Sequence, residues 1–244
     1  MVEGDKMPEW QTIKNAGSIL IEDRLEDGPA IRNARQFLHD TSVAFVKHCI
    51  DYYDIVGEFP FIYRERQLHS ALFPSIAKIA DAAFMEQPVT RKTKDISGHG
   101  WLDYWILYHT SVFLIELKHS WNAIRTDSIR TTTQESWTEA LTQLEKIQKD
   151  DDVADLSFTA RSVAKIALMV VPFFETSKEK KALTVMGQPE IQEVFLTFVN
   201  GLKPAPNWSC AWLLHRKFQE KPVDFENRFE AYPCVGVVAM VKPV

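Results

Sequence analysis

The sequence predicts a single α/β domain in which a mixed sheet is flanked by helices. Apolar residues recur three or four positions apart over residues 31–55, which is the spacing of one helical face. Residues 111–117 and 162–174 are apolar runs rich in β-branched and aromatic residues, as buried strands are. No stretch rich in Gly, Pro or Ser divides the 244 residues, and one large domain can have this length.

The composition is that of a soluble globular protein and excludes several other classes. A hydrophobic fraction of 45% and a charged fraction of 25% are ordinary for a soluble globular chain, and a net charge of -5 excludes a polycation that coats nucleic acid. Three widely spaced cysteines without a CxxC pair argue against a disulfide framework or zinc knuckle and favour a reducing cytoplasm. We find neither a signal peptide nor an apolar run near the roughly 20 residues that span a bilayer, so no membrane partner is expected.

The first 60 residues are predicted to form an N-terminal helical extension. Residues 1–30 are polar and weakly periodic, which indicates an irregular arm or short helix, and a packing helix follows over 31–55. A second helical pattern covers residues 64–85, where Pro74 predicts a kink or two shorter helices. Glu65 falls at the N-terminal end of its inward stripe, although a solvated acid favoured by the helix dipole is an equal alternative there.

Residues 61–175 are predicted to form the core, and residues 176–244 a C-terminal helix with two strands. The elements predicted for the core after the helix are an edge strand over 87–94, a turn over 95–100, strands over 101–108 and 111–117 joined at His109-Thr110, a helix from about 133 that ends at Lys149 to Asp152, and a strand over 162–174. The C-terminal elements are a helix from about Glu190 that stops at Gly201 and strands over 208–216 and 234–242.

Three charged residues lie within the two apolar strands of the predicted hairpin. Charged side chains are rarely buried unless they are paired or bind a metal, so Asp103, Glu116 and Lys118 need an explanation. A turn at 109–110 places Asp103 and Glu116 side by side, where two like charges repel unless a cation lies between them. Mg²⁺ or Mn²⁺ suits such a site, since Mg²⁺ is bound by one or two carboxylates with waters and substrate phosphate.

Further groups around this pair suggest hydrolytic chemistry. Lys118 follows Glu116 by two residues on the same strand face, from which its ammonium can orient an attacking water or stabilise charge on a phosphorane-like state. The Leu117 carbonyl can add a backbone ligand, and Glu65 can complete the metal shell directly or through water. His69, four residues after Glu65, is read as an outer-shell or ordinary surface histidine.

At these residues the chain resembles the PD-(D/E)xK, or restriction-endonuclease-like, nuclease superfamily. Asp103 and the run Glu116-Leu117-Lys118 match its D…ExK signature, with Leu102 in place of the proline. The resemblance implies a restriction-endonuclease-like core ordered α-β-β-β-α-β, in which Glu65 corresponds to a helical acid and Gln143 to a glutamine of some subfamilies. It also implies a metal-dependent nuclease that hydrolyses phosphodiester bonds in DNA. By this resemblance, the catalytic residues would be Asp103, Glu116, Lys118 and Glu65. The metal ligands would be Asp103, Glu116, Leu117 and Glu65.

Nucleic-acid contacts would come from basic and aromatic residues that flank the site. The basic candidates are Arg64, Arg66, Arg91, Lys92, Lys94, Lys118, His119, Arg125 and Arg130. Four tryptophans are candidates for base stacking, with a core position preferred for two of them: Trp101 and Trp121, and then Trp105 and Trp137.

Two other functions and a homodimer remain open. One alternative is a catalytically inactive member of the same fold, a nucleic-acid-binding or protein-interaction module in which the charged residues form a partly buried cluster. Another is a metal-dependent hydrolase with a different phosphate substrate. No glycine-rich phosphate loop occurs, which excludes an NTPase or dinucleotide-binding interpretation.

Overall fold

The computed structural model describes residues 9–93, 96–126, 128–147 and 160–244. The strands are β1 (Gln11–Ile13), β2 (Gly17–Asp23), β3 (Ala82–Thr93), β4 (Ile96–Tyr108), β5 (Ser111–His119), β6 (Asn122–Ala123), β7 (Ser162–Ser177), β8 (Trp208–Leu214), β9 (Val223–Phe225) and β10 (Arg228–Pro243). The helices are α1 (Pro29–Val56), α2 (Glu65–Ala77), α3 (Thr131–Glu145), α4 (Gln188–Gly201) and the short α5 (Arg216–Gln219). Among these residues, ten strands form one sheet.

The sheet is mixed and mostly antiparallel. Its strand order is β1-β2-β8-β10-β7-β5-β4-β3, with β6 paired to β7 and β9 to β10. Within the described ranges, the pairings of β5 and β6 with β7 are parallel and all others are antiparallel. A parallel pair needs a crossover connection, and α3 supplies part of the one between β5 and β7. Apart from the short strand β6, residues 65–177 follow the predicted order of helix, three strands, helix and strand.

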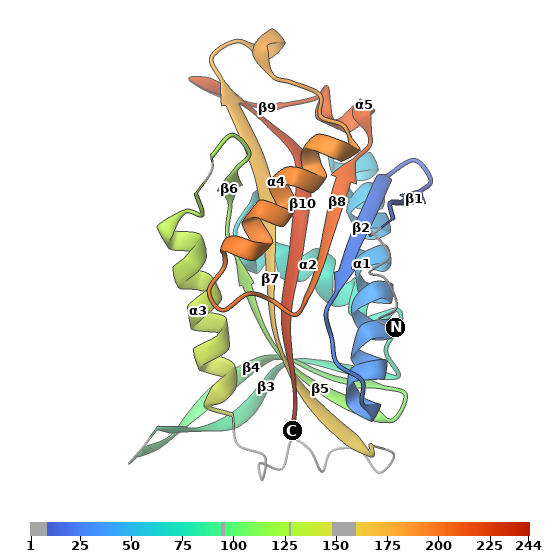
Figure 1. Ribbon diagram of the computed structural model, residues 1–244, viewed down its shortest axis with the longest axis vertical. Helices are drawn as coiled ribbons and strands as arrows, with labels where there is room; N and C mark the ends of the chain where they lie inside the picture. Colours follow the sequence, from blue (N-terminus) through green and yellow to red (C-terminus); the bar gives the residue numbers. More distant parts are fainter. Residues whose placement is uncertain (1–8, 94–95, 127, 148–159) are drawn as a thin grey trace, which may run out of the picture.

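Helices cover both faces of the sheet (Figure 1). On one face, α1 and α2 contribute side chains such as Phe37 and Leu72 to a core that includes Ile115 of β5. On the other face, α3 and α4 enclose a second core that includes Trp137 and Phe195. The sheet therefore has two buried faces, which explains why its central strands read as continuous apolar runs.

The hairpin of β4 and β5 turns at His109 and Thr110, as predicted, and His109 has a positive φ of 54°. Its register pairs Tyr108 with Ser111 and ends with Tyr104 opposite Ile115. Beyond that pair, β4 continues only beside β3 in the described part of the chain, which lets the two strands extend as a ribbon away from β5 (Figure 1). The divergence begins at Asp103.

The predicted irregular arm over residues 1–30 is wrong for the part that the structure describes. Residues 11–13 and 17–23 form an antiparallel pair, and β2 joins the main sheet beside β8. Ile19 and Leu20 contribute to opposite cores, so β2 is buried on both faces and lacks the alternation of a half-exposed strand. The N-terminal extension is therefore both helical and extended.

The predicted helix over residues 64–85 is also too long. The helix α2 contains Pro74 and ends at Ala77, and β3 begins at Ala82. Residues 82–85 have neutral or helix-favouring composition, but pairing with residues 104–107 of β4 decides their conformation. The predicted turn over 95–100 is wrong for the same reason, because residues 96–100 extend β4.

Smaller differences concern element ends. The strand β8 ends at Leu214 instead of residue 216, β10 begins at Arg228 instead of residue 234, and Gly201 is the last residue of α4 instead of its stop signal. The helix α3 ends at Glu145 instead of at Lys149 to Asp152, and the basic candidate Lys94 lies outside the described residues.

Two further findings concern the thiols and the helices. Cys49, Cys210 and Cys234 are all buried with free thiols. Within the described ranges, no helix combines the length and apolarity needed to cross a membrane.

Candidate functional site

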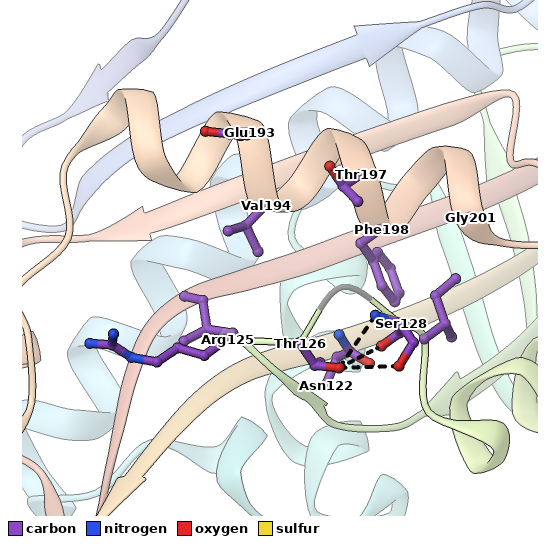
Figure 2. Close-up of a pocket in the computed structure, with 11 residues that line it drawn as sticks. Asn122, Arg125, Thr126, Ser128, Glu193, Val194, Thr197, Phe198 and Gly201 are labelled. Carbon is purple, nitrogen blue, oxygen red and sulfur yellow. Dashed lines mark hydrogen bonds between the residues drawn. The ribbon is translucent and has the colours of Figure 1, made fainter.

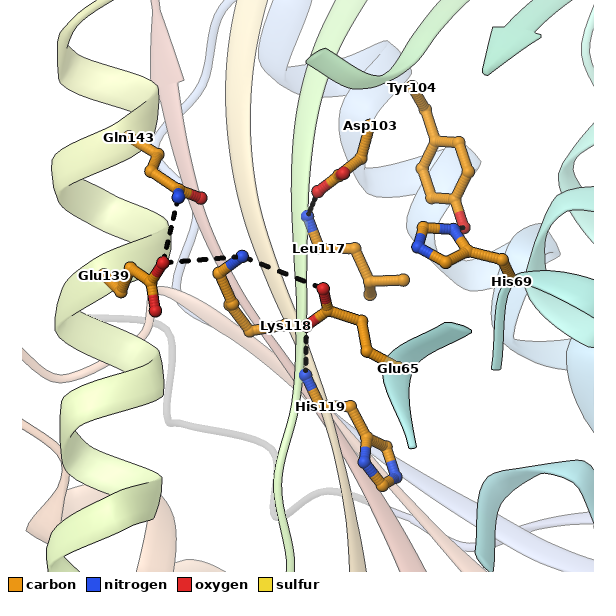
Figure 3. Close-up of polar contacts among 9 residues, drawn as sticks. All are labelled: Glu65, His69, Asp103, Tyr104, Leu117, Lys118, His119, Glu139 and Gln143. Atoms are coloured by element: carbon orange, nitrogen blue, oxygen red, sulfur yellow. Dashed lines mark hydrogen bonds and ion pairs between the residues drawn. The ribbon is translucent and has the colours of Figure 1, made fainter. Parts of the chain in front are cut away.

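Two carboxylates occupy the edge of β5 that β4 leaves (Figure 3). The backbone N–H of Leu117 donates a hydrogen bond of 2.7 Å to Asp103 Oδ2, and the N–H of His119 donates one of 3.2 Å to Glu65 Oε2. Amides two residues apart in a strand face the same edge, so the two acids replace consecutive ladder partners that β4 would have supplied. Glu65 and Asp103, from distant parts of the sequence, are thereby held at neighbouring positions.

The side chain of Lys118 lies between α2 and α3. Its Nζ is 3.8 Å from Glu65 Oε1 and 4.0 Å from Glu139 Oε1, and the lysine side chain is 14% exposed. Gln143 Nε2 donates a hydrogen bond of 3.0 Å to the same Glu139 oxygen. Glu139 was not among the predicted site residues, although its place four residues before Gln143 puts both on one helix face.

The surroundings of Glu65 raise the pKa of its carboxyl group on balance. Burial raises the pKa of the Glu65 carboxyl group, and the neighbouring Asp103 charge raises it further. The Lys118 ammonium and the His119 N–H act in the opposite direction, but the net shift of the pKa is upward. A cation bound beside Glu65 and Asp103 would supply the missing compensation.

Glu116 is the most buried of the predicted acids, at 1% exposure. It alternates with Leu117 along β5 and therefore belongs to the strand face that carries Leu114 and packs toward α3. If the register of the hairpin continued, Glu116 would lie opposite Asp103, but the strand pairing ends one residue earlier. The structure thus gathers Asp103, Glu65 and Lys118 around the edge of β5, with Glu116 in the same strand.

Leu117 contributes its backbone at this edge. In a strand, the N–H and C=O groups of one residue point to the same side. Since the Leu117 N–H meets Asp103, its carbonyl also faces the side that holds the carboxylates. The predicted role of that carbonyl as a backbone ligand is compatible with this orientation.

His69 lies beside the site in contact with Tyr104. Its Nδ1 is 2.6 Å from the Tyr104 hydroxyl, and burial lowers the pKa of the imidazole, which favours the neutral ring. Burial also raises the pKa of Tyr104 well above its ordinary value. This neutral pair packs next to Asp103 and can fix the position where β4 diverges.

The donor set suits a hard cation. Among the described residues, no group of three His, Cys, Asp or Glu side chains is close enough to hold a metal by itself. Mg²⁺, however, is usually bound by one or two carboxylates, with waters and substrate phosphate in the remaining positions. Two carboxylates and a backbone carbonyl on one strand edge fit that mode.

The flanking basic residues have different environments. Arg64 and Arg66 are exposed, whereas Arg125 forms an ion pair of 2.6 Å with Glu175. His119 is 8% exposed, its Nε2 contacts the Phe61 carbonyl at 2.9 Å, and burial lowers its pKa to about 4, so at neutral pH it is no cationic contact. The side chains of Arg91 and Lys92 lie outside the described part of the structure.

The tryptophans divide as predicted. Trp105 and Trp137 are core residues, at 1% and 0% exposure, whereas Trp101 is 62% exposed and Trp121 is half-buried. Trp101 lies on the ribbon of β3 and β4, and Trp121 follows β5 directly. Only these two tryptophans of the four present surface for stacking.

A separate cavity lies between the loop after β6 and α4 (Figure 2). It has a volume of about 340 Å³, and its polar lining includes Asn122, Arg125, Thr126 and Ser128. None of the residues lining this cavity belongs to the carboxylate and lysine cluster of Figure 3.

No protein-family model matches this chain, and no curated protein or solved structure does so either. The interpretation of the site rests on its residues and their geometry.

Proposed function

We propose that the chain is a metal-dependent nuclease of the PD-(D/E)xK kind, which hydrolyses phosphodiester bonds in DNA. The observation that carries this proposal is the convergence of Asp103, Glu65 and Lys118 at the edge of β5 where β4 departs. Asp103 and Lys118 belong to the D…ExK signature, and Glu65 matches the helical acid that the resemblance implies. Their oxygens and ammonium lie on a strand edge that would otherwise be closed by backbone pairing.

The strand arrangement supports the same proposal. A restriction-endonuclease-like core is expected to have a mixed sheet in the order α-β-β-β-α-β. Here α2, β3, β4, β5, α3 and β7 follow that order, and the first three strands are antiparallel neighbours. The parallel pairing of β5 with β7 provides the mixed character.

Each residue has a distinct part in the proposed reaction. Asp103, Glu65 and the Leu117 carbonyl would hold Mg²⁺ or Mn²⁺, with Glu116 assigned as a further ligand from its place in the motif. The metal, when bound, lowers the pKa of water and polarises a phosphoryl oxygen. Lys118 would orient the attacking water through its ammonium, which Glu139 holds from α3. The water oxygen bonds to phosphorus, the ester P–O bond breaks, and the leaving oxygen takes up a proton.

The proposed partners follow from this reaction. DNA would be the substrate, a homodimer would allow both strands to be cut, and free thiols at all three cysteines suit the cytoplasm. The net charge of -5 requires local basic contacts for binding.

A second candidate function is a catalytically inactive module that binds nucleic acid or protein. It is favoured by the position of Lys118 between Glu65 and Glu139, since a lysine held by two carboxylates is also a structural ion-pair arrangement. In that case the edge carboxylates would only satisfy the free amides of β5.

A cleavage assay separates the two functions. Wild-type protein and Lys118→Ala are incubated with Mg²⁺ or Mn²⁺ and with supercoiled, linear and single-stranded DNA, RNA and small phosphoesters. The nuclease proposal predicts cutting of DNA by the wild type and a loss of at least about 100-fold in Lys118→Ala, since activation of the attacking water contributes on the order of 10² to 10⁴. Glu145→Gln, an exposed acid of α3 bound to Lys242, is the matched control and should cut normally.

Metal binding gives a second readout. Titration with Mn²⁺ should show weaker binding in Asp103→Ala than in the wild type, because a carboxylate ligand is removed. If the wild type cuts none of these substrates and Asp103→Ala leaves metal affinity unchanged, the nuclease proposal fails.

A further inference from the structure

A second cavity is lined by the end of β7, the start of β10 and β9. These segments lie together at the top of Figure 1. Its volume is about 450 Å³, which is within the range of roughly 300–1,000 Å³ of small-molecule sites. The lining residues that matter here are Trp121, Arg130, Phe174, Phe225, Arg228 and Glu230. They come from the segment after β5 and from β7, β9 and β10.

The cavity combines guanidinium groups with aromatic rings. The Arg130 Cζ is 5.8 Å from the centroid of the Phe174 ring, and the Arg228 Cζ is 5.4 Å from that of Phe225. A contact with an aromatic ring restricts the orientation of a guanidinium group. Nucleic-acid bases stack on the planes of guanidinium groups as they do on aromatic side chains. Phe225 is 40% exposed, and the Arg228 side chain is 51% exposed.

The charge of the cavity favours an anion. Glu230 accepts a hydrogen bond of 2.7 Å from Arg228 Nε and one of 2.6 Å from the Tyr232 hydroxyl, so this carboxylate is compensated within the wall. Arg130 makes a hydrogen bond of 3.4 Å to the Trp121 carbonyl, which is neutral. Because Arg130 and Arg228 carry two positive charges and Glu230 one negative charge, the lining of the cavity has a net positive charge.

The cavity is connected to the proposed nuclease site through adjacent residues. The His119 N–H binds Glu65, and the His119 ring stands edge-on to Trp121 with centroids 4.4 Å apart. Trp121 in turn lines the cavity. Glu65, His119 and Trp121 thus form a continuous series of contacts from the proposed site to the wall of the cavity.

We infer that this cavity binds an unstacked nucleotide of a single-stranded nucleic acid, with its base against the aromatic and guanidinium groups and its phosphate at Arg130 and Arg228. The inference rests on the proposed function, since it takes a nucleic acid as the substrate. It goes further by assigning a single-stranded segment, because a paired base within a duplex is not free to enter a pocket of this kind.

Binding is tested separately from cleavage. All proteins carry Asp103→Asn, and the fluorescence anisotropy of a labelled oligothymidylate and of a duplex of equal length is measured in EDTA at fixed salt. Phe225→Ala and Arg130→Gln should each weaken binding of the single strand by about tenfold, the order expected for losing one stacked base or one phosphate contact. Binding of the duplex should change less.

Matched controls lie elsewhere on the surface. Arg216→Gln removes an exposed arginine of α5, and Phe84→Ala removes an exposed phenylalanine of β3. Neither should alter binding of the single strand, and thermal unfolding midpoints verify that every variant is folded. The inference is overturned if folded Phe225→Ala and Arg130→Gln bind the oligonucleotide as their parent does, or if an acidic peptide displaces it while thymidine monophosphate does not.

The outcomes separate this inference from the nuclease proposal. Binding that depends on the cavity in a protein that never cuts DNA supports the inference and removes the nuclease. Cleavage that is unaffected by both cavity variants supports the nuclease and removes the inference.

Discussion

Two pairs of buried or half-buried acids in this protein are compensated in different ways. Glu175 and Glu230, on β7 and β10, each have an arginine of their own, with Nε at 2.6 and 2.7 Å. Each also accepts a second hydrogen bond, from the Thr184 N–H or the Tyr232 hydroxyl. Both carboxylates are therefore fully engaged by protein groups.

Within the described part of the chain, neither Asp103 nor Glu65 has an arginine partner. Each accepts one backbone N–H of β5, and the Lys118 ammonium, which lies 3.8 Å from Glu65 Oε1, is shared with Glu139. The pKa of Glu65 rises as a result of burial that these contacts do not offset. Glu175 and Glu230 therefore act as stabilising groups of the fold, whereas Asp103 and Glu65 have carboxylate charge that an added cation could neutralise.

The largest expected effect is on cleavage. Asp103→Asn keeps an acceptor for the Leu117 N–H but removes the charge, and we expect the rate to fall by more than about 100-fold, since changing even outer partners of a metal site costs about 10- to 100-fold. Glu175→Gln, measured in the same assay, should retain the wild-type rate. Equal losses in both variants would remove the distinction between the two pairs of acids.

The next effect is the acid sensitivity conferred by His119. Its pKa of about 4 in the fold is below the ordinary 6.5, so between these values the unfolded chain binds a proton that the folded chain does not. Stability is thus fully present above about pH 6.5 and decreases as the pH falls toward 4, by up to about 3 kcal/mol. Urea unfolding from pH 4 to 7.5 should show this slope in the wild type and a flatter one in His119→Gln, whereas His215→Gln, at an exposed histidine, should keep the slope.

A smaller effect is expected on the stability supplied by Glu175. Glu175→Gln weakens a charged hydrogen bond at a side chain that is 9% exposed, and we expect a loss of about 1 to 2 kcal/mol. Urea unfolding measures it, and a double-mutant cycle with Arg125→Gln isolates the pair. Additive losses in the cycle would show that the two side chains contribute independently.

The smallest effect concerns Glu65, whose side chain is 36% exposed. Because its pKa is raised in the fold, its favourable contribution is present below about pH 4.5 and is lost as the pH rises through the raised pKa. The unfolding midpoint of Glu65→Gln relative to the wild type should therefore be higher at pH 7 than at pH 4. A difference between the two proteins that does not vary with pH would contradict the raised pKa, and Glu145→Gln, at an exposed acid, is the control.

Much of the fold was predictable from sequence because its central elements have strong periodic or apolar patterns. The helix over 31–55, the hairpin turn at 109–110 and the strand over 162–174 are all confirmed within a few residues. The strand β2 and the first five residues of β3, 82–86, were missed, since their conformation depends on pairing with β8 and β4, which no local pattern reports, whereas the edge strand predicted over 87–94 corresponds to the rest of β3.

The candidate site shows the same division. Motif spacing pointed to Asp103, Glu116 and Lys118, and the structure places two of these three with Glu65 at one strand edge. The use of backbone amides by Asp103 and Glu65 was not predictable, because it depends on where β4 leaves β5. Glu139 was missed since its contact with Lys118 comes from the crossover between β5 and β7.

The divergence of β4 also has a mechanical consequence. Residues 96–103 of β4 and their partners in β3 form a two-stranded ribbon. It leaves the main sheet at Asp103, the first residue beyond the last pair of β4 with β5. A two-stranded ribbon is only marginally stable by itself, so its orientation depends on the point where it joins the rest of the sheet. We expect a bound strand that presses on the ribbon to shift the Asp103 carboxylate relative to Leu117, which would couple substrate length to the alignment of the site.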